Sequence, residues 1–154
     1  MFSAKRRLLL KSSLYSGMAL LYPVFSKAAH SAGLAEAFSA KPYADILKKL
    51  FSTRAIIETD LLKISLPQIV ENGAAAPITI SSNLDNIQRI YILVEKNPTP
   101  LAAEFTFSSE LAVYITTRIK MAESSHVVII AEQGNQLLSN QQWVNVVLGG
   151  CGSG

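Results

Sequence analysis

The last six residues surround the only cysteine of the chain, Cys151, with small residues just after an apolar segment, Trp143–Leu148. A cysteine thiolate is a nucleophile and forms S–S bonds, which a serine oxygen cannot do. Glycine lacks a β-carbon and gives almost no steric cover. We therefore predict a flexible arm that exposes a sulfur nucleophile. The arm consists of Gly149, Gly150, Cys151, Gly152, Ser153 and Gly154.

The surroundings of this thiol in the sequence supply access but no activation. No Lys, Arg or His follows His126, so the pKa expected for Cys151 is that of an ordinary cysteine, about 8.5. The cysteine lies three residues beyond Leu148, which limits its backbone to about 10 Å from the end of the last apolar segment. Activation of the thiol must then come from partner enzymes.

Other residue types that can do chemistry are weaker candidates. His126 begins a predicted strand, where a surface or capping role is expected, and Trp143 is expected to be a packing or interface residue. Glu95 and Glu104 flank a proline loop in separate segments and do not form a convincing acid pair. One cysteine and two histidines fall short of a zinc ligand set, so no metal site is predicted.

The first 33 residues have the pattern of an export signal. A positive region, Lys5–Lys11, precedes an apolar run, Leu14–Phe25, of 12 residues. About 20 residues are needed to span a bilayer, so no membrane anchor is predicted. Arg6 and Arg7 begin a motif similar to the twin-arginine export signal, which carries folded cargo. We predict a signal peptide over 1–33, with an uncertain cleavage site, and a location in the periplasm.

The charge that remains after this segment argues against nucleic-acid binding. The first 33 residues contain five basic residues and no acidic one, so the remainder has 14 − 5 = 9 basic residues against 11 acidic ones. A body with a charge of about −2 offers no basic field to a phosphate backbone. A role in binding nucleic acid is therefore excluded.

The rest of the chain predicts a short helical segment followed by strands. Apolar residues recur at roughly helical spacing over 34–59, most clearly in Tyr43–Phe51. From residue 60 to 148 the period becomes two, and seven apolar segments alternate with turn-forming residues. This pattern is typical of an all-β, immunoglobulin-like antiparallel β-sandwich. The segments are Leu61–Leu66, Ile78–Ser82, Ile87–Glu95, Ala102–Phe107, Ala112–Ile119, His126–Ala131 and Trp143–Leu148.

Four segments of the chain together resemble a known family. The ending GGCGSG resembles the C-terminal GGCGG motif of the SoxY family, the sulfur-carrier subunits of the bacterial sulfur-oxidising system. Ile69–Ile80, Ile92–Phe105 and Thr117–Val127 also resemble SoxY segments in order and spacing. Ser153 departs from the usual ending and moves the terminal carboxylate slightly further from Cys151.

The resemblance implies a non-catalytic carrier rather than an enzyme. In this family a c-type cytochrome joins thiosulfate to the arm cysteine as a cysteine S-thiosulfonate. A hydrolase then releases sulfate, and a sulfane dehydrogenase oxidises the remaining sulfur. The implied partner is a SoxZ-like subunit in a heterodimer. No cofactor is implied besides the sulfur adducts, thiosulfonate and persulfide, on Cys151.

Two other classes of function stay open at this point. The chain could be a periplasmic thiol-redox or electron-relay protein, although it has no second cysteine to form a CxxC pair. It could also be a structural sandwich that Cys151 crosslinks to another chain. The exposed thiol further predicts a Cys151 disulfide dimer in an oxidising compartment.

Overall fold

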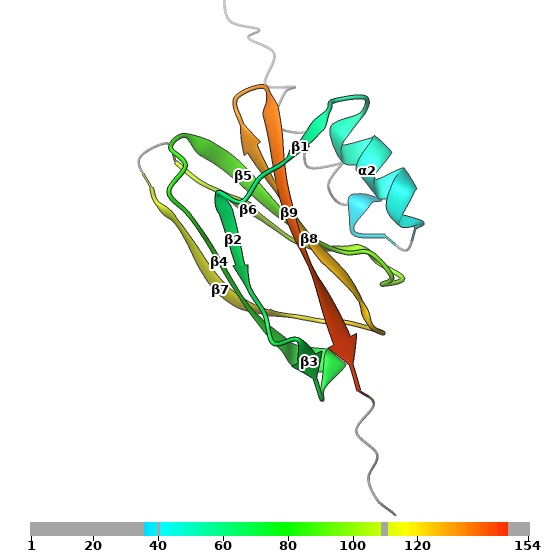
Figure 1. Cartoon of the computed structure of the whole chain (residues 1–154). Helices are drawn as coiled ribbons and strands as arrows, with labels where there is room; N and C mark the ends of the chain where they lie inside the picture. The colour runs from blue at the N-terminus through cyan, green and yellow to red at the C-terminus, as the bar shows by residue number, and fades with distance from the viewer. Residues whose placement is uncertain (1–35, 40, 109–110, 148–154) are drawn as a thin grey trace, which may run out of the picture. The chain divides into compact units, whose positions relative to one another are not determined.

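The computed structural model describes residues 36–39, 41–108 and 111–147 of the 154-residue chain (Figure 1). The predicted signal, with Arg6 and Arg7, lies outside the described residues. So does the predicted arm, 149–154, with Cys151. Within the described part, no helix has the length and apolar character needed to cross a membrane.

The helix α2 occupies Tyr43–Phe51, the residues with the clearest helical spacing. Pro42 stands just before it, where a missing backbone N–H costs nothing, and the Pro42 carbonyl accepts the first hydrogen bonds of the helix. Asp45 in the first turn and basic residues in the last turn complement the helix dipole. The apolar face of α2 buries Ile46 and Phe51.

Two β-sheets form the body, and α2 lies beside the larger one (Figure 1). The larger sheet has the order β1-β9-β8-β5-β6, with β3 also paired to β9, and the smaller sheet has the order β2-β4-β7. The predicted all-β sandwich with one short helix is therefore confirmed. The strands are β1 (Ile56–Glu58), β2 (Leu62–Ser65), β3 (Ile69–Val70), β4 (Ala76–Ser82), β5 (Ile87–Val94), β6 (Leu101–Thr106), β7 (Val113–Ile119), β8 (Ser125–Gln133) and β9 (Gln136–Val146).

The central strands β5 and β8 are buried on both faces, which explains their unbroken apolar sequences. Ile90 and Ile129 point between the two sheets, into the main core. Tyr91 and Ile130 point to the opposite side, where they pack with Phe51 of α2 in a second apolar cluster. The edge of the Tyr91 ring meets Phe51, with ring centroids 5.0 Å apart. The helix is thus needed to cover the outer face of the sheet.

The sheet differs from the prediction in two strands that pair in parallel. The described residues contain nine strands rather than about seven, and β1 and β3 each run parallel to β9. Strand β1 also falls inside the segment 34–59, for which a helical lead-in was predicted. Both strands are three residues or shorter and show no alternating pattern, so only their pairing with β9 defines them.

Strand β9 begins earlier than predicted, because its middle residues, 139–142, are polar and interrupt the apolar pattern. Instead of Trp143–Leu148, it occupies Gln136–Val146. Its amide side chains close one side of the sandwich: Asn140 Nδ2 donates to the carbonyl of Leu62 at 2.6 Å, and Gln142 Nε2 donates to that of Leu66 at 2.9 Å. Polar residues at these positions therefore stabilise contacts between the two sheets.

A cluster of charged side chains lies beside the second apolar cluster. Glu132 pairs with Arg54 at 2.5 Å and with Arg89 at 3.1 Å, and the Tyr91 hydroxyl lies 3.5 Å from the same carboxylate. Burial alone raises the pKa of Glu132, but the hydrogen bonds and charges of the two arginines outweigh it and lower that pKa. Burial, followed by the charges of Glu104 and Glu132, raises the pKa of Tyr91 to about 12.

We expect Gly73→Ala to destabilise the fold at the end where β9 finishes. The Gly73 carbonyl accepts a hydrogen bond from Met121 N at 2.6 Å, and an added β-carbon would lie 2.3 Å from the Met121 oxygen. The backbone at Gly73 or Met121 must then shift. We expect the free energy of unfolding, measured by urea denaturation, to fall by about 2–3 kcal/mol.

The matched control for this substitution is Gly134→Ala. Gly134 has φ +57° with no atom near the new carbon, so only the backbone strain of about 1 kcal/mol is expected. Equal losses in the two variants would contradict the close approach at Gly73.

Candidate functional site at the end of the last strand

The chain reaches its C-terminal tail from a backbone that is held on both sides. The N–H of Val147, the last described residue, donates to the carbonyl of Val70 in β3 at 3.0 Å. One residue earlier, the N–H of Val146 donates to Ser124 Oγ at 2.9 Å. Cys151 follows Val147 by four residues, so covalent geometry limits the distance between their Cα atoms to about 14 Å. The cysteine is therefore tethered close to a fixed point.

The side chains beside this point form a connected group on the outer face of the sheet. His126 Nδ1 lies 3.2 Å from Glu95 Oε2, and the imidazole ring meets the ring of Trp143 edge-on at 4.9 Å. Trp143 Nε1 donates to Asn145 Oδ1 at 3.0 Å, and the Lys96 ammonium lies 5.6 Å from the Trp143 ring centroid. The register between β8 and β9, which places His126 opposite Trp143, brings these residues together.

The structure settles several sequence predictions about single residues. His126 is a partly exposed strand residue paired with Glu95, in keeping with the surface role expected for it. Glu95 and Glu104 do not form an acid pair, because Glu104 lies 3.4 Å from Arg89 Nε in a separate ion pair. Glu95 instead adds to the effect of burial at Tyr43, and the two together raise the pKa of Tyr43 to about 12.

Sequence reasoning missed two features of this region. Nothing in the local pattern indicated that Lys96 would lie over Trp143, or that Ile69 would join the last strand. A charged residue directly after a buried strand was the one available signal for Lys96. No signal identified Ile69, because β3 exists through its pairing with β9.

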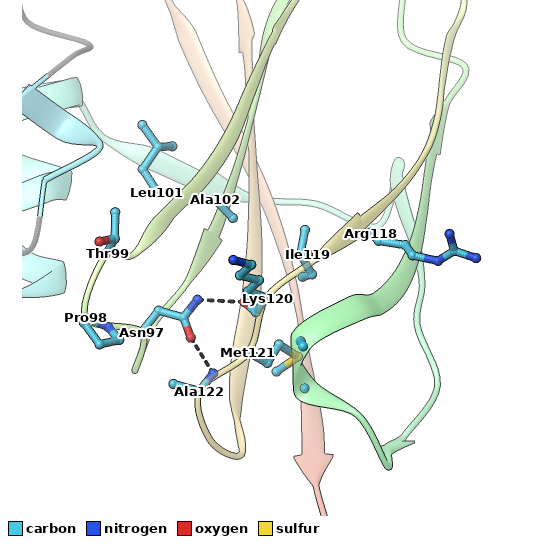
Figure 2. A pocket seen from close by; sticks show the side chains of 12 residues that line it. Asn97, Pro98, Thr99, Leu101, Ala102, Arg118, Ile119, Lys120, Met121 and Ala122 are labelled. Atoms are coloured by element: carbon cyan, nitrogen blue, oxygen red, sulfur yellow. Dashed lines mark hydrogen bonds between the residues drawn. The ribbon is translucent and has the colours of Figure 1, made fainter.

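A hollow of about 700 Å³ lies between the start of β6 and the end of β7 (Figure 2). Gly73, Met121 and Ile119 line part of it, and a β-carbon at Gly73 would lie 3.1 Å from Val146 Cγ1, next to the end of β9. Figure 2 shows the Arg118 side chain pointing away from the other labelled residues. Among the described residues that line it, none has a carboxylate, imidazole or thiol.

Asn97 holds one wall of this hollow to the other (Figure 2). Its Nδ2 donates to the carbonyl of Lys120 at 2.7 Å, and its Oδ1 accepts from Ala122 N at 2.8 Å. These two bonds tie the loop after β5 to the segment that joins β7 and β8. Within the described residues, no group of three or more His, Cys, Asp or Glu side chains could hold a metal ion.

Fold and site together define an immunoglobulin-like β-sandwich protein whose last strand leads directly to a single cysteine. The chain belongs to the SoxY family: the family model described as sulfur oxidation protein SoxY matches residues 47–151, more than half of the chain. The match ends on Cys151.

Two solved structures are similar to the chain. The chain is similar to the sulfur carrier protein SoxY from Chlorobium limicola f thiosulfatophilum, with 26% identity and a TM-score of 0.63 over 71% of this chain and 100% of that one. A superoxide reductase (neelaredoxin) from Ignicoccus hospitalis has 17% identity and a TM-score of 0.43 over 58% of this chain and 82% of its own. No curated protein matches the chain.

We expect Asn97→Ala to destabilise the protein by about 2 kcal/mol, because it removes both hydrogen bonds across the hollow and leaves backbone groups without their partner. Asn97→Asp keeps the acceptor for Ala122 but cannot donate to Lys120, so a smaller loss is expected. Thermal and urea unfolding of the three proteins measure the order. Wild-type stability in Asn97→Ala would refute this role.

Proposed function

We propose that this protein is a periplasmic sulfur carrier that holds thiosulfate-derived sulfur on Cys151 and presents it to enzymes. The observation that carries the proposal is the SoxY-family match, which covers 47–151 and so includes the only cysteine of the chain. The similar solved protein from Chlorobium limicola f thiosulfatophilum is described as a sulfur carrier. The twin-arginine-like segment with Arg6 and Arg7 supports export in a folded state.

The chemistry of a thiol fits each step of such a cycle. Loading joins the Cys151 sulfur to the terminal sulfur of thiosulfate: the thiol loses a proton, an S–S bond forms, and two electrons pass to a c-type cytochrome. Hydrolysis then breaks the bond between sulfur and the sulfonate group, consumes one water and releases sulfate and one proton. A persulfide, Cys–S–SH, remains on Cys151. A sulfane dehydrogenase would oxidise its outer sulfur to a sulfonate, with oxygen atoms from three waters and six electrons passed to the acceptor of that enzyme.

In this proposal the enzymes provide the catalysis and the carrier provides access. No basic residue follows His126 in the sequence, so the partner's active site must activate the thiol. Ordering five tail residues inside a cleft costs about 5–10 kcal/mol of backbone entropy, which makes docking weak and reversible. A carrier that several enzymes use in turn requires such binding.

A SoxZ-like subunit is the proposed stable partner, in a heterodimer. The described part of this chain forms a single two-sheet sandwich, and we propose that the second subunit is a separate chain exported from the cytoplasm together with this one. The folded-cargo signal at Arg6 and Arg7 supports joint export, because a signal on one chain can carry both.

We expect Cys151→Ser to abolish sulfur loading and to leave unfolding and partner binding unchanged, because the residue follows the last strand. Mass spectrometry of protein purified from thiosulfate-grown cells checks this: the wild type gains the mass of a thiosulfonate or a persulfide, and the variant gains neither. A disulfide dimer as the sole product in the wild type would favour the crosslinking function, and thiol and disulfide forms alone would favour a redox relay.

We also expect the air-exposed protein to form a Cys151–Cys151 dimer that reductant reverses, because the glycine neighbours offer little steric cover. The dimer has no free thiol and accepts no sulfur until it is reduced. Non-reducing electrophoresis and thiol titration measure this. A monomeric band with a thiol that still titrates would show that Cys151 is shielded.

A further inference from the structure

Three exposed apolar side chains surround the root of the tail on one face. Ile69 is 60% exposed, Trp143 is 43% exposed and Val147 is 50% exposed. In β9 the residues Trp143 and Asn145 point outward, and Ile69 lies opposite Asn145 in the parallel pairing with β3. We call Ile69, Trp143 and Val147 the collar. The strand neighbours Val70 and Val144 point into the main core, so Ile69 and Trp143 share the outer surface, and Val147 directly follows β9 beside β3.

The aromatic side chain of the collar, Trp143, is already held in place by neighbouring side chains. Trp143 has His126 against its ring, Asn145 on its indole nitrogen and Lys96 near its ring centroid. A tryptophan held in this way loses little rotamer freedom on binding, which favours its use as an interface anchor. Single exposed apolar residues are common on protein surfaces, but three in a row on one face, one of them a tryptophan held by its neighbours, favour contact with another protein.

The length of the tail limits which protein can contact the collar. Cys151 follows Val147 by four residues, so its Cα lies within about 14 Å of the collar. An enzyme that takes the cysteine into its active site must bring the rim of that site to the collar, because the folded sandwich cannot enter. We propose that the collar is the docking surface for the enzymes that act on the Cys151 adduct. The inference rests on the proposed function, since it takes Cys151 as the point of attachment.

The collar also specifies the chemistry of the docking partner. Apolar side chains at Ile69, Trp143 and Val147 require an apolar rim around the entrance to the active site. Lys96, whose ammonium lies beside Trp143, adds a positive charge at one edge. Glu95, the nearest acidic group to His126, is engaged by that imidazole. A carboxylate on the rim, facing Lys96, completes the match.

Trp143→Ala in the full chain, with its partner subunit, tests the proposal. The first measurement is kcat/KM for the attachment of thiosulfate to Cys151 by the c-type cytochrome purified from the same thiosulfate-grown cells as the carrier. The second is the rate at which iodoacetamide alkylates Cys151, which no docking surface affects. We expect kcat/KM to fall about tenfold or more and alkylation to stay within about twofold of the wild type. Ile69→Ser, at an exposed site, is also expected to lower kcat/KM for loading. This second variant keeps the test valid if Trp143→Ala fails to fold.

Tyr114→Ala provides the matched control. Tyr114 is an aromatic residue of β7 in the other sheet, 72% exposed, at the strand end away from Gly73. Both rates should match the wild type in this variant. An equal fall in kcat/KM for Tyr114→Ala and Trp143→Ala would show that apolar surface in general matters, and would overturn the proposal.

Other results separate this inference from the function on which it rests. Loss of the partner subunit from Trp143→Ala, seen by size-exclusion chromatography, would assign the collar to the heterodimer, and a change in self-association would assign it to a second copy. Either result overturns the proposal, as does a fall in alkylation equal to the fall in loading. Normal loading of Trp143→Ala would contradict the docking role of the collar and leave the carrier function intact. The absence of any sulfur adduct on the wild-type protein would contradict the carrier function itself.

Discussion

Strand β9 pairs on both of its edges, and this pairing holds the larger sheet together and fixes the place where the sandwich ends. Along one edge β9 runs antiparallel to β8, and along the other it pairs in parallel with β1 and then with β3. The second pairing reaches Val146, and the Val147 N–H extends it by one hydrogen bond to Val70. A terminal strand held on one edge would fray. With both edges paired, the position from which the chain continues to Cys151 is fixed.

This arrangement separates stability from chemistry. The two apolar clusters, one between the sheets and one under α2, lie in the body and stabilise the fold. In the sequence the single cysteine follows β9, outside both clusters, and the proposed function uses it as the point of attachment. A buried cysteine would be protected but inaccessible, and a cysteine on a long linker would search a large volume. The four-residue separation from Val147 limits how far Cys151 can lie from the end of β9.

The outer face of the larger sheet shows how one surface serves two purposes. At one end α2 covers Tyr91 and Ile130, and the charges of Arg54, Arg89 and Glu132 border that cluster. At the other end no described element covers Trp143, which packs with His126 in the open. The helix is too short to reach both ends, so the uncovered part of the sheet adjoins the tail root. The same strands thus supply a buried cluster and an accessible surface.

The class of fold and the helix Tyr43–Phe51 could be predicted from the sequence, which also shows where along the chain the one cysteine stands. The predictions depend on local properties: alternation of apolar residues in strands and the helical spacing beside Pro42. Strands β4, β5, β7 and β8 lie close to their predicted bounds because their apolar residues report burial directly.

The segments beside the end of β9 could not be predicted, because they are brought there by strand pairing across the fold. Strands β1 and β3 are too short to leave a local pattern. Residues 139–142 of β9 are polar and resemble a loop in sequence, although Asn140 and Gln142 bind the backbone of β2 and the residue that follows it. Ile69 joins Trp143 through a parallel pairing across a long sequence separation, and Lys96 reaches the same ring because β5, β8 and β9 are adjacent. Many segments have a similar local propensity to pair as strands. The packing of the whole core determines which of them pair.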